Sequence, residues 1–254
     1  MILAIHIGNS NLTVGGVEAG ELRFVGRLTT EPRTEDEFAA ALQGLLQLYG
    51  VEQKPAGAII ASVVPPLTQP VCAAAARLTG RRPLVVGPGV KTGLNIAIEN
   101  PNQLGSDLVV AAAAAAARYP LPLVVVALGT ATTFSVVDAH RSFRGGIIAP
   151  GVCVGHDALI ERASMLTPAE LTAPKAVIGA NTADSLRSGC VLGAAAMIDG
   201  LLLRIEDELG ESVTAVATGS LAGLVTPHCR HAIAADEHLG LKGLALLYDK
   251  NTRK

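Results

Sequence analysis

One strand–turn motif occurs twice in this chain. Near the start, an apolar segment ends at Ile7 and is followed by Gly8-Asn9-Ser10-Asn11. Far downstream, the apolar run 124–128 is followed by Gly129-Thr130-Ala131-Thr132-Thr133. In each case glycine permits close backbone approach, and the small residues after it offer N–H and O–H donors to an anion. The repetition predicts two duplicated halves that hold one phosphate chain between them.

Composition indicates a globular protein. Half of the residues are apolar, 17% are charged and the net charge is −2. The absence of a basic block argues against nucleic acid as the main partner. The four cysteines are scattered without a CxxC pair, which is typical of free thiols in a reducing cytosol. The N-terminus reads as a strand rather than a leader, and the longest apolar stretch, 108–117, is too short for a bilayer. We therefore expect a cytoplasmic location and no membrane partner.

Strand and helix patterns alternate along the chain, which predicts α/β layers. The expected strands are 1–7, 12–17, 22–28, 58–64, 83–86, 121–128, 133–138, 213–217 and 232–235. The expected helices are 34–49, 68–78, an alanine-rich helix after Asp107, 182–209 with interruptions at Gly189, Gly193 and Gly200, and 241–248. A capping box at Thr34 and Glu37 opens the first helix. We expect a tight corner at 145–151, a functional loop at 87–104, and two domains, 1–118 and 119–254, with ligand in the cleft between them.

Seven short motifs in a fixed order resemble those of the type III pantothenate kinases. They are Ile7-Gly8-Asn9-Ser10-Asn11, Ser62-Val63-Val64-Pro65, Gly105-Ser106-Asp107, Gly129 to Thr133, Gly145 to Gly151, Asn181-Thr182 and Ala217-Thr218-Gly219. The resemblance covers nearly the whole chain. It implies a duplicated actin-like (ribonuclease H-like) fold of the acetate and sugar kinase superfamily. It also implies phosphorylation of pantothenate by ATP, the first step of coenzyme A biosynthesis, in a dimer that uses Mg²⁺ and a monovalent cation, K⁺ or NH₄⁺.

The resemblance assigns roles to individual residues. Asp107 matches the general base that accepts the hydroxyl proton. The nucleotide path would be lined by Gly8, Asn9, Ser10, Asn11, Gly129, Thr130, Ala131, Thr132 and Gly219. Pantothenate would be bound by Gly105, Ser106, Asp107, Ile98 and Thr182. From the residues alone, a helix N-cap is the preferred interpretation of Asp107 and the simplest one of Thr182, and one residue can serve both purposes.

Four positions depart from the family pattern. His6 and Ala127 stand where aspartates tied to the metal and the monovalent cation are expected. Leu108 replaces an arginine that helps hold the pantothenate carboxylate, and Ile98 replaces an aromatic residue. Imidazole does not supply the hard oxygen ligands that Mg²⁺ prefers. Because loss of one preorganised charge commonly costs about 10²–10³ in rate, we expect the isolated chain to be weak or inactive.

Two other functions stay open at this point. A copy with a degraded site could be a non-catalytic (pseudokinase) subunit that pairs with an active paralogue. Alternatively, the chain could sense pantothenate or a nucleotide. The remaining candidate residues have simple structural interpretations. We expect a surface loop rather than a metal cluster for His228, Cys229, His231 and His238, and loop positions for His140 and His156. For Lys91 and Arg144 we expect a solvated face rather than a role in steering an anion.

Overall fold

The computed structural model describes residues 1–252, which form two compact units that alternate along the chain. Unit 1 comprises Met1–Gly93, Asn100–Ala114 and the C-terminal segment from Leu239. Unit 2 comprises Leu94–Glu99 and Ala115–His238. The domain limits 1–118 and 119–254 stay a prediction. The compact units differ from a single cut near residue 118 because the last helix packs in unit 1.

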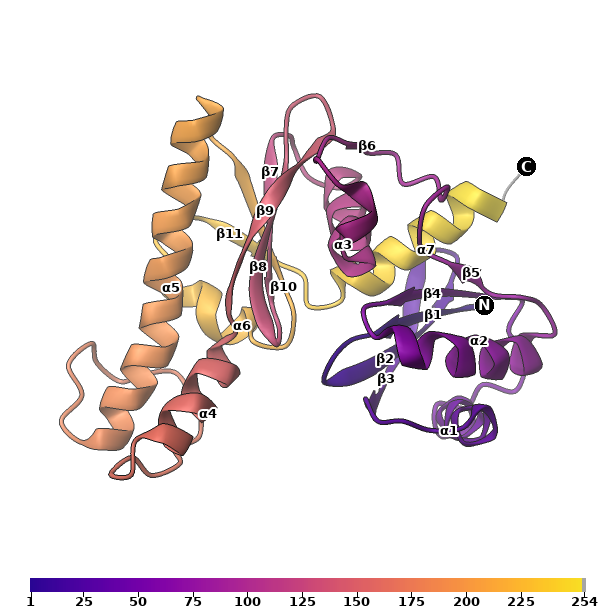
Figure 1. The fold of residues 1–254 in the computed structure, drawn as a ribbon, viewed down its shortest axis with the longest axis horizontal. Helices are drawn as coiled ribbons and strands as arrows, with labels where there is room; N and C mark the ends of the chain where they lie inside the picture. The colour runs from indigo at the N-terminus through magenta and orange to yellow at the C-terminus, as the bar shows by residue number, and fades with distance from the viewer. Residues whose placement is uncertain (253–254) are drawn as a thin grey trace. The chain divides into compact units, whose positions relative to one another are not determined.

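Unit 1 contains a five-stranded sheet in the order β3-β2-β1-β4-β5 (Figure 1). Its strands are β1 (Ile2–Ile7), β2 (Asn11–Glu18), β3 (Glu21–Thr29), β4 (Ala58–Ser62) and β5 (Leu84–Val85). The first three strands form an antiparallel meander, whereas β4 and β5 run parallel to β1. The helices of this unit are α1 (Glu35–Leu48), α2 (Pro65–Thr79), α3 (Ser106–Ala116) and α7 (Leu239–Thr252), with a 3-10 turn at Pro101–Gln103.

The core of unit 1 lies between the sheet and the helices α1 and α2. Ile5 and Ile7 of β1 are fully buried and belong to one cluster with Phe38 of α1 and Val71 of α2. The predicted capping box is confirmed, because Thr34 and Glu37 exchange side-chain and backbone hydrogen bonds at the start of α1. It satisfies backbone donors that the first helical turn leaves unpaired.

Helix α7 packs against β1 and β4. A Cβ at Gly243 of α7 would overlap the carbonyl oxygen of Val110 in α3, so glycine lets these two helices approach closely. Helix α7 begins at Leu239, two residues before the predicted start at 241. At Leu239 the chain returns from unit 2 to unit 1.

Unit 2 repeats the sheet of unit 1. Its strands are β7 (Leu123–Leu128), β8 (Ala131–Val137), β9 (Ser142–Pro150), β10 (Thr214–Thr218), β11 (Ile233–Ala235) and β6 (Asn95–Ile96). The order β11-β10-β7-β8-β9-β6 contains the same meander, followed by two parallel strands beside its first strand. The predicted duplicated α/β fold is therefore confirmed.

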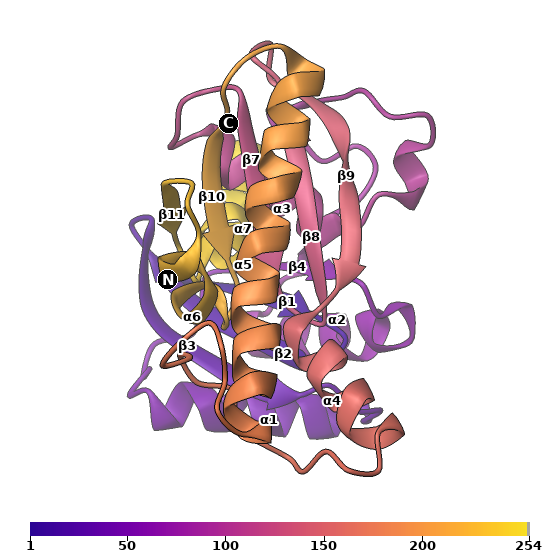
Figure 2. The same ribbon diagram turned by 90° about the vertical axis from the view of Figure 1, so that its left-hand side faces the viewer.

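One long helix covers the core face of this second sheet. Helix α5 (Thr182–Leu209) buries Ile198 and Leu202 in one cluster with Val124 and Val126 of β7. Helix α4 (Val152–Arg162) lies beside the N-terminal part of α5 (Figure 2). A short helix α6 (Ala222–Val225) and a 3-10 turn (Thr226–His228) follow β10.

Three details of unit 2 differ from expectation. The tight corner predicted at 145–151 is wrong, because Gly145–Pro150 continues strand β9. A Cβ at Gly146 would overlap the Phe134 carbonyl oxygen, so the glycines permit close strand contact next to a bulge rather than a turn. Helix α4 was not predicted. Helix α5 runs without a break through Gly189, Gly193 and Gly200, because its packed face outweighs the weak helix propensity of glycine.

Helix α5 is also long and apolar enough to cross a membrane by length and composition alone. This is weak evidence, since the core helix of a soluble protein meets the same criterion and α5 supplies eight buried side chains to unit 2.

Candidate functional site

The first glycine turn joins β1 to β2 in unit 1. The Gly8 N–H donates to the Asn11 carbonyl oxygen at 3.0 Å. Thr30, just beyond β3, braces the turn from outside: its Oγ1 donates to the Gly8 carbonyl at 2.7 Å and its N–H donates to the Ser10 carbonyl at 3.1 Å. Asn9 and Ser10 are exposed. The turn is thus held in one conformation while its tip faces solvent.

Asp107 is fixed beside the carboxyl end of β1 through its neighbour. Ser106 Oγ accepts a hydrogen bond from the Ser62 N–H at 3.1 Å and donates to the Ser62 carbonyl at 3.0 Å. Ser62 ends β4 and pairs in register with Ile7 of β1. The start of α3 is thereby tied to the sheet edge from which the first glycine turn departs.

The N-cap interpretation of Asp107 is wrong. Helix α3 begins at Ser106, so Asp107 lies inside the first turn, where a carboxylate is favoured by the helix dipole. Its Oδ1 lies 2.5 Å from the position that a Cβ would take at Gly105, so the carboxylate is folded back over that glycine. Asp107 makes no hydrogen bond within residues 1–252, which leaves it available to a ligand.

His6 lies in β1, two residues before Gly8. Its imidazole Cε1 lies 3.3 Å from the place that a Cβ atom would take at Gly8, so the ring lies against this glycine. Its Nε2 is buried and has no hydrogen-bond partner within the described chain. Burial lowers the pKa of His6 below its ordinary value, and the Asp107 carboxylate opposes that shift. His6 and Asp107 therefore act on one another electrostatically in unit 1.

The second and third glycine turns come together in unit 2. Strands β7 and β10 are parallel, with Ala127 opposite Thr218, so Gly129 and Gly219 leave the same edge of the sheet. Gly219 has φ +97°, and a Cβ there would overlap the Leu128 carbonyl oxygen. Glycine is required at this position both by its conformation and by the close approach of the backbone.

The second turn is braced by its own unit. The Gly129 N–H donates to the Ala131 carbonyl at 3.1 Å, and the Gly151 N–H donates to the Thr130 carbonyl at 3.2 Å. Thr132, which the resemblance places on the nucleotide path, is completely buried, and its Oγ1 has no partner among residues 1–252. Ala131 is partly exposed.

The positions predicted to bind pantothenate are divided between the two units. Gly105, Ser106 and Asp107 lie in unit 1, whereas Ile98 and Thr182 lie in unit 2. The N-cap of α5 is Asn181, whose side chain accepts a hydrogen bond from the Asp184 N–H, so the N-cap interpretation of Thr182 is wrong. Thr182 instead lines a cavity of about 850 Å³ between α4 and α5.

This α4–α5 cavity is mainly apolar. His156 lines it and is buried, so the expectation of a loop position for His156 is wrong. Its Nδ1 contacts the Asp157 carboxylate at 2.9 Å, and its Nε2 is buried without a partner in the described residues. Arg162 and Cys190 also line the cavity. Large apolar side chains are exposed on α4 (Val154 and Leu159) and in the segment between α4 and α5 (Met165, Val177 and Ile178).

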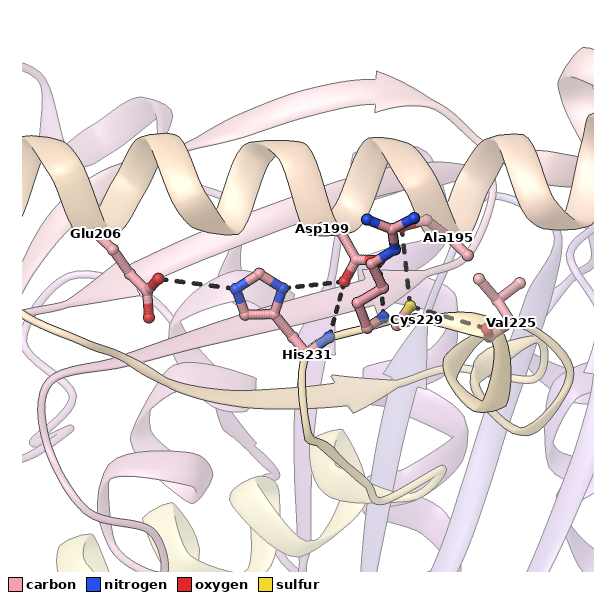
Figure 3. A network of polar contacts seen from close by, with 7 residues as sticks. Ala195, Asp199, Glu206, Val225, Cys229 and His231 are labelled. Carbon is pink, nitrogen blue, oxygen red and sulfur yellow. Dashed lines mark hydrogen bonds and ion pairs between the residues drawn. The ribbon is translucent and has the colours of Figure 1, made fainter.

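The histidines near the C-terminal end of unit 2 do not form a metal cluster. His231 Nδ1 lies 3.0 Å from Asp199 Oδ1 of α5, and its Nε2 lies 3.7 Å from Glu206 Oε2 (Figure 3). Asp199 also accepts hydrogen bonds from the backbone N–H groups of Arg230 and His231. Within residues 1–252 no group of three or more His, Cys, Asp or Glu is placed to hold a metal. The network ties the chain before β11 to α5.

Two electrostatic shifts belong to this network. Burial would raise the pKa of Asp199, but the hydrogen bonds from His231 and Arg230 outweigh it and hold that pKa below its ordinary value. Burial, with Asp199 nearby, raises the pKa of Cys229 to about 11, so its thiol stays protonated. Cys229 Sγ lies 3.9 Å from the Ala195 carbonyl, in a structural position.

Of the two residues considered for anion steering, Arg144 makes an ion pair through its side chain and Lys91 a hydrogen bond through its backbone. Arg144 contacts the Asp138 carboxylate at 3.4 Å, and the backbone N–H of Lys91 donates to Asn251 Oδ1 at 2.9 Å. His140 is exposed next to Asp138, in agreement with a loop position.

The donor set at the sheet edges does not fit a protein-held Mg²⁺. Mg²⁺ bound by kinases usually takes one or two carboxylates together with substrate phosphates. In unit 1, position 6 offers an imidazole and Asp107 a carboxylate, whereas in unit 2 position 127 offers only a methyl group. Leu108, at the position where the resemblance leads us to expect an arginine, has an apolar, half-buried side chain.

Two sheets of like strand order, each with glycine turns at the carboxyl end of its strands, define a duplicated actin-like fold. Solved structures agree in fold. The activator of 2-hydroxyisocaproyl-CoA dehydratase from Clostridium difficile is 11% identical, with a TM-score of 0.56 over 97% of this chain and 93% of that chain. A ROK family glucokinase from Streptomyces griseus is 13% identical, with a TM-score of 0.53 over 97% of this chain and 98% of that chain.

Sequence comparison identifies the family. The family model for type III pantothenate kinase matches residues 2–204. A type III pantothenate kinase from Exiguobacterium sp. is 40% identical over 255 residues, covering 100% of both chains. The chain belongs to the type III pantothenate kinase family.

Proposed function

We propose that this chain transfers the γ-phosphoryl group of ATP to the primary hydroxyl of pantothenate, giving 4'-phosphopantothenate in the cytoplasm. The observation that carries the proposal is the position of Asp107, which the Ser62–Ser106 contacts hold at the sheet edge that bears the first glycine turn. A carboxylate in the first turn of a helix that makes no hydrogen bond among the described residues is suited to accept a hydroxyl proton.

The reaction divides between positioning and proton transfer. The backbone N–H groups after Gly8 and Gly129 would bind the phosphates, and Gly219 would give room to the nucleoside. The pantothenate hydroxyl oxygen forms the new bond to the γ-phosphorus as its proton passes to Asp107. The bond between the γ-phosphorus and the β–γ bridging oxygen breaks, and ADP leaves. Mg²⁺ bound to the nucleotide would neutralise phosphate charge.

We further propose that the isolated chain is a slow enzyme. His6, Ala127 and Leu108 remove two carboxylates and a guanidinium from positions where the family pattern has charge. Because each such charge commonly contributes about 10²–10³ in rate, turnover should fall well below the roughly 1–100 s⁻¹ of ordinary kinases. Ala127 also removes the expected ligand of K⁺ or NH₄⁺, so activity should respond little to these cations.

The active form in this proposal is a homodimer. The exposed apolar side chains of α4 and of the segment before α5, with Leu159 and Ile178 among them, would be covered by a second copy. Thr182, which lines the α4–α5 cavity, would then contact pantothenate bound to its own copy or to the second copy.

The decisive experiment is a pantothenate kinase assay on the pure chain beside the double variant His6→Asp/Ala127→Asp. We expect the double variant to exceed the unaltered chain in kcat by at least about tenfold. Asp107→Asn in the same background is the control and should abolish the gain. Turnover of the unaltered chain at ordinary kinase rates would refute the slow-enzyme proposal. Absence of activity in both proteins would refute the kinase proposal itself.

A second function is favoured by the clustering of the substitutions at one site. The chain would pair with a paralogue that retains both aspartates and would contribute Thr182 to the partner's site. Co-expression with such a paralogue, followed by co-purification and assay, distinguishes this heteromer from a homodimer. A pantothenate or nucleotide sensor would instead show thermal stabilisation by the ligand without turnover.

A further inference from the structure

The α4–α5 cavity of unit 2 contains a buried polar atom without a protein partner. His156 of α4 lines this cavity, and its side chain is only 10% exposed. Its Nε2 is buried and has no hydrogen-bond partner among the described residues. Buried polar atoms nearly always have a partner, so an unpaired one in a native structure calls for a partner that the protein itself does not supply.

The neighbouring carboxylate determines which nitrogen of the His156 ring carries the hydrogen. His156 Nδ1 lies 2.9 Å from Asp157 Oδ1, and an ionised carboxylate accepts hydrogen bonds but does not donate them. In the neutral ring the hydrogen is therefore on Nδ1, and Nε2 has a free lone pair. The cavity thus offers a ligand one buried hydrogen-bond acceptor at a fixed position on α4.

The rest of the cavity suits an apolar molecule. Its volume of about 850 Å³ is within the range of roughly 300–1,000 Å³ that is typical of small-molecule sites. Its walls are mainly apolar, with Leu159, Leu166 and Leu186 among them, and Ser185 already donates to the Gly179 carbonyl. A buried water needs about two to four polar partners, and such walls offer few. An apolar molecule with one hydroxyl group suits both the walls and the His156 acceptor.

A cation lines the same cavity. The Arg162 side chain is exposed and makes no hydrogen bond or ion pair among the described residues, so its charge is available to a ligand. Arg162 follows His156 by six residues of α4, which corresponds to about 9 Å along the helix axis. A ligand that reaches both residues therefore carries a hydroxyl group and a carboxylate, separated by an apolar chain of about that length.

We propose that the α4–α5 cavity binds an aliphatic hydroxy carboxylate, whose hydroxyl donates a hydrogen bond to His156 Nε2 and whose carboxylate is bound by Arg162. Pantothenate has this chemistry, because it carries hydroxyl groups and a carboxylate on one short chain, and Thr182 lines the same cavity. The inference deepens the proposed function and rests on it for the natural ligand. It assigns to His156 and Arg162 the selection of the substrate, and no covalent bond is formed or broken in this binding step.

Calorimetric titration of the full chain with three matched probes tests the inference. The first probe, 8-hydroxyoctanoate, carries both polar groups, whereas octanoate lacks the hydroxyl and octan-1-ol lacks the carboxylate. We expect 8-hydroxyoctanoate to bind the unaltered chain about five- to tenfold more tightly than octanoate, which is the contribution of one hydrogen bond.

Two variants connect each polar group of the probe to one residue. His156→Phe keeps a ring and removes the acceptor, so the preference should reverse, because the hydroxyl of the probe is then buried without a partner. Arg162→Gln should weaken both carboxylates by about threefold or more and leave octan-1-ol unchanged. His140→Phe and Arg204→Gln, at exposed positions of unit 2, are the matched controls and should change none of these affinities.

The probes are compared within one protein, so a lower stability of a variant does not imitate the expected result. Thermal unfolding of each variant confirms that it is folded at the temperature of the titration. The inference is overturned if His156→Phe prefers 8-hydroxyoctanoate over octanoate as strongly as the unaltered chain does. It is also overturned if none of the three probes binds the unaltered chain.

Steady-state kinetics separate this site from the kinase proposal. We expect 8-hydroxyoctanoate to compete with pantothenate and not with ATP. His156→Phe should raise KM for pantothenate by about tenfold with little change in KM for ATP. A chain that binds the probes as expected but never phosphorylates pantothenate would retain the site and reject the kinase proposal. Phosphorylation of pantothenate with an unchanged KM in both His156→Phe and Arg162→Gln would reject the site and retain the kinase proposal.

Discussion

Ser106 and Ser62 exchange two hydrogen bonds, with Ser106 Oγ accepting from the Ser62 N–H at 3.1 Å and donating to the Ser62 carbonyl at 3.0 Å. One hydroxyl thereby satisfies both backbone groups at the end of β4, where the ladder with β1 stops. The contact also fixes the first turn of α3, which carries Asp107. The position of the proposed base therefore depends on a side chain that need not touch the substrate.

Replacing Ser106 by alanine should lower both stability and turnover. The Ser62 N–H and carbonyl lose their partner, which should reduce the free energy of unfolding by about 1–2 kcal/mol in urea titrations. Because Asp107 is no longer held in place, kcat should fall by about tenfold or more, with a smaller change in KM. Ser212→Ala, at an exposed serine of unit 2, is the control and should change neither quantity. An unchanged kcat in Ser106→Ala would contradict the positioning role.

Stability should decrease on mild acidification because of His6. Its pKa in the folded chain lies below the ordinary value of 6.5, so the unfolded chain binds a proton first as the pH falls. The contribution of the neutral ring is complete above about pH 6.5 and is lost as the pH falls through the folded-state pKa. Urea unfolding at a series of pH values should show this loss in the unaltered chain and a flatter profile in His6→Gln. Equal slopes for the two proteins would count against a buried neutral ring.

Replacing Asp199 by alanine should destabilise unit 2. Two backbone N–H groups and the His231 ring lose a common acceptor whose side chain is only 13% exposed, which should cost about 2–4 kcal/mol. Asp207→Ala, at an exposed position of the same helix, should cost less than about 0.5 kcal/mol. Thermal unfolding of both variants measures the difference. In the unaltered chain the Asp199 contribution is present above its ordinary pKa of 3.8 and is lost below it.

Alanine at Gly219 should disturb the third glycine turn. The residue has φ +97°, and the added Cβ would overlap the Leu128 carbonyl oxygen, so we expect a loss of about 2 kcal/mol or more in stability. ATP binding, measured by calorimetry, should weaken in the same variant if this turn contacts the nucleoside. Gly223→Ala, in α6 with open space around the added Cβ, should be neutral or slightly stabilising. Equal behaviour of the two variants would contradict the close packing of this turn.

The sequence predicted local structure well where one residue pattern dominates. The apolar strand 1–7, the capping box at Thr34 and the strands 12–17 and 22–28 were all predicted, and each depends on neighbours in the chain. Where long-range packing decides, the prediction failed. Gly145 and Gly146 carry a turn signal, but pairing with β8 keeps both in β9, and Gly146 lies directly against the Phe134 carbonyl. Helix α4 was missed because glycine and a buried histidine weaken its pattern.

The sequence also identified the residues of the candidate site, but it did not reveal their support. The order of the glycine turns identified the family and the positions at which this chain departs from it. Nothing in the sequence connects Ser106 with Ser62, Asp199 with His231, or Thr182 with a cavity, because these partners are far apart in the chain. Likewise, sequence alone presents His6 as a missing carboxylate, whereas the fold buries its Nε2 without a partner among the described residues.

By itself the sequence determined the duplicated α/β architecture and the family, since strand–turn–helix order and glycine positions are local properties that survive in the linear chain. The tertiary structure alone decided that Gly129 and Gly219 share one sheet edge, that Asp107 is anchored through a serine, and that the Nε2 of His6 is buried without a partner. The physical reason is that burial and hydrogen-bond satisfaction depend on which distant segments meet, and β1, β4 and α3 meet only in the folded chain.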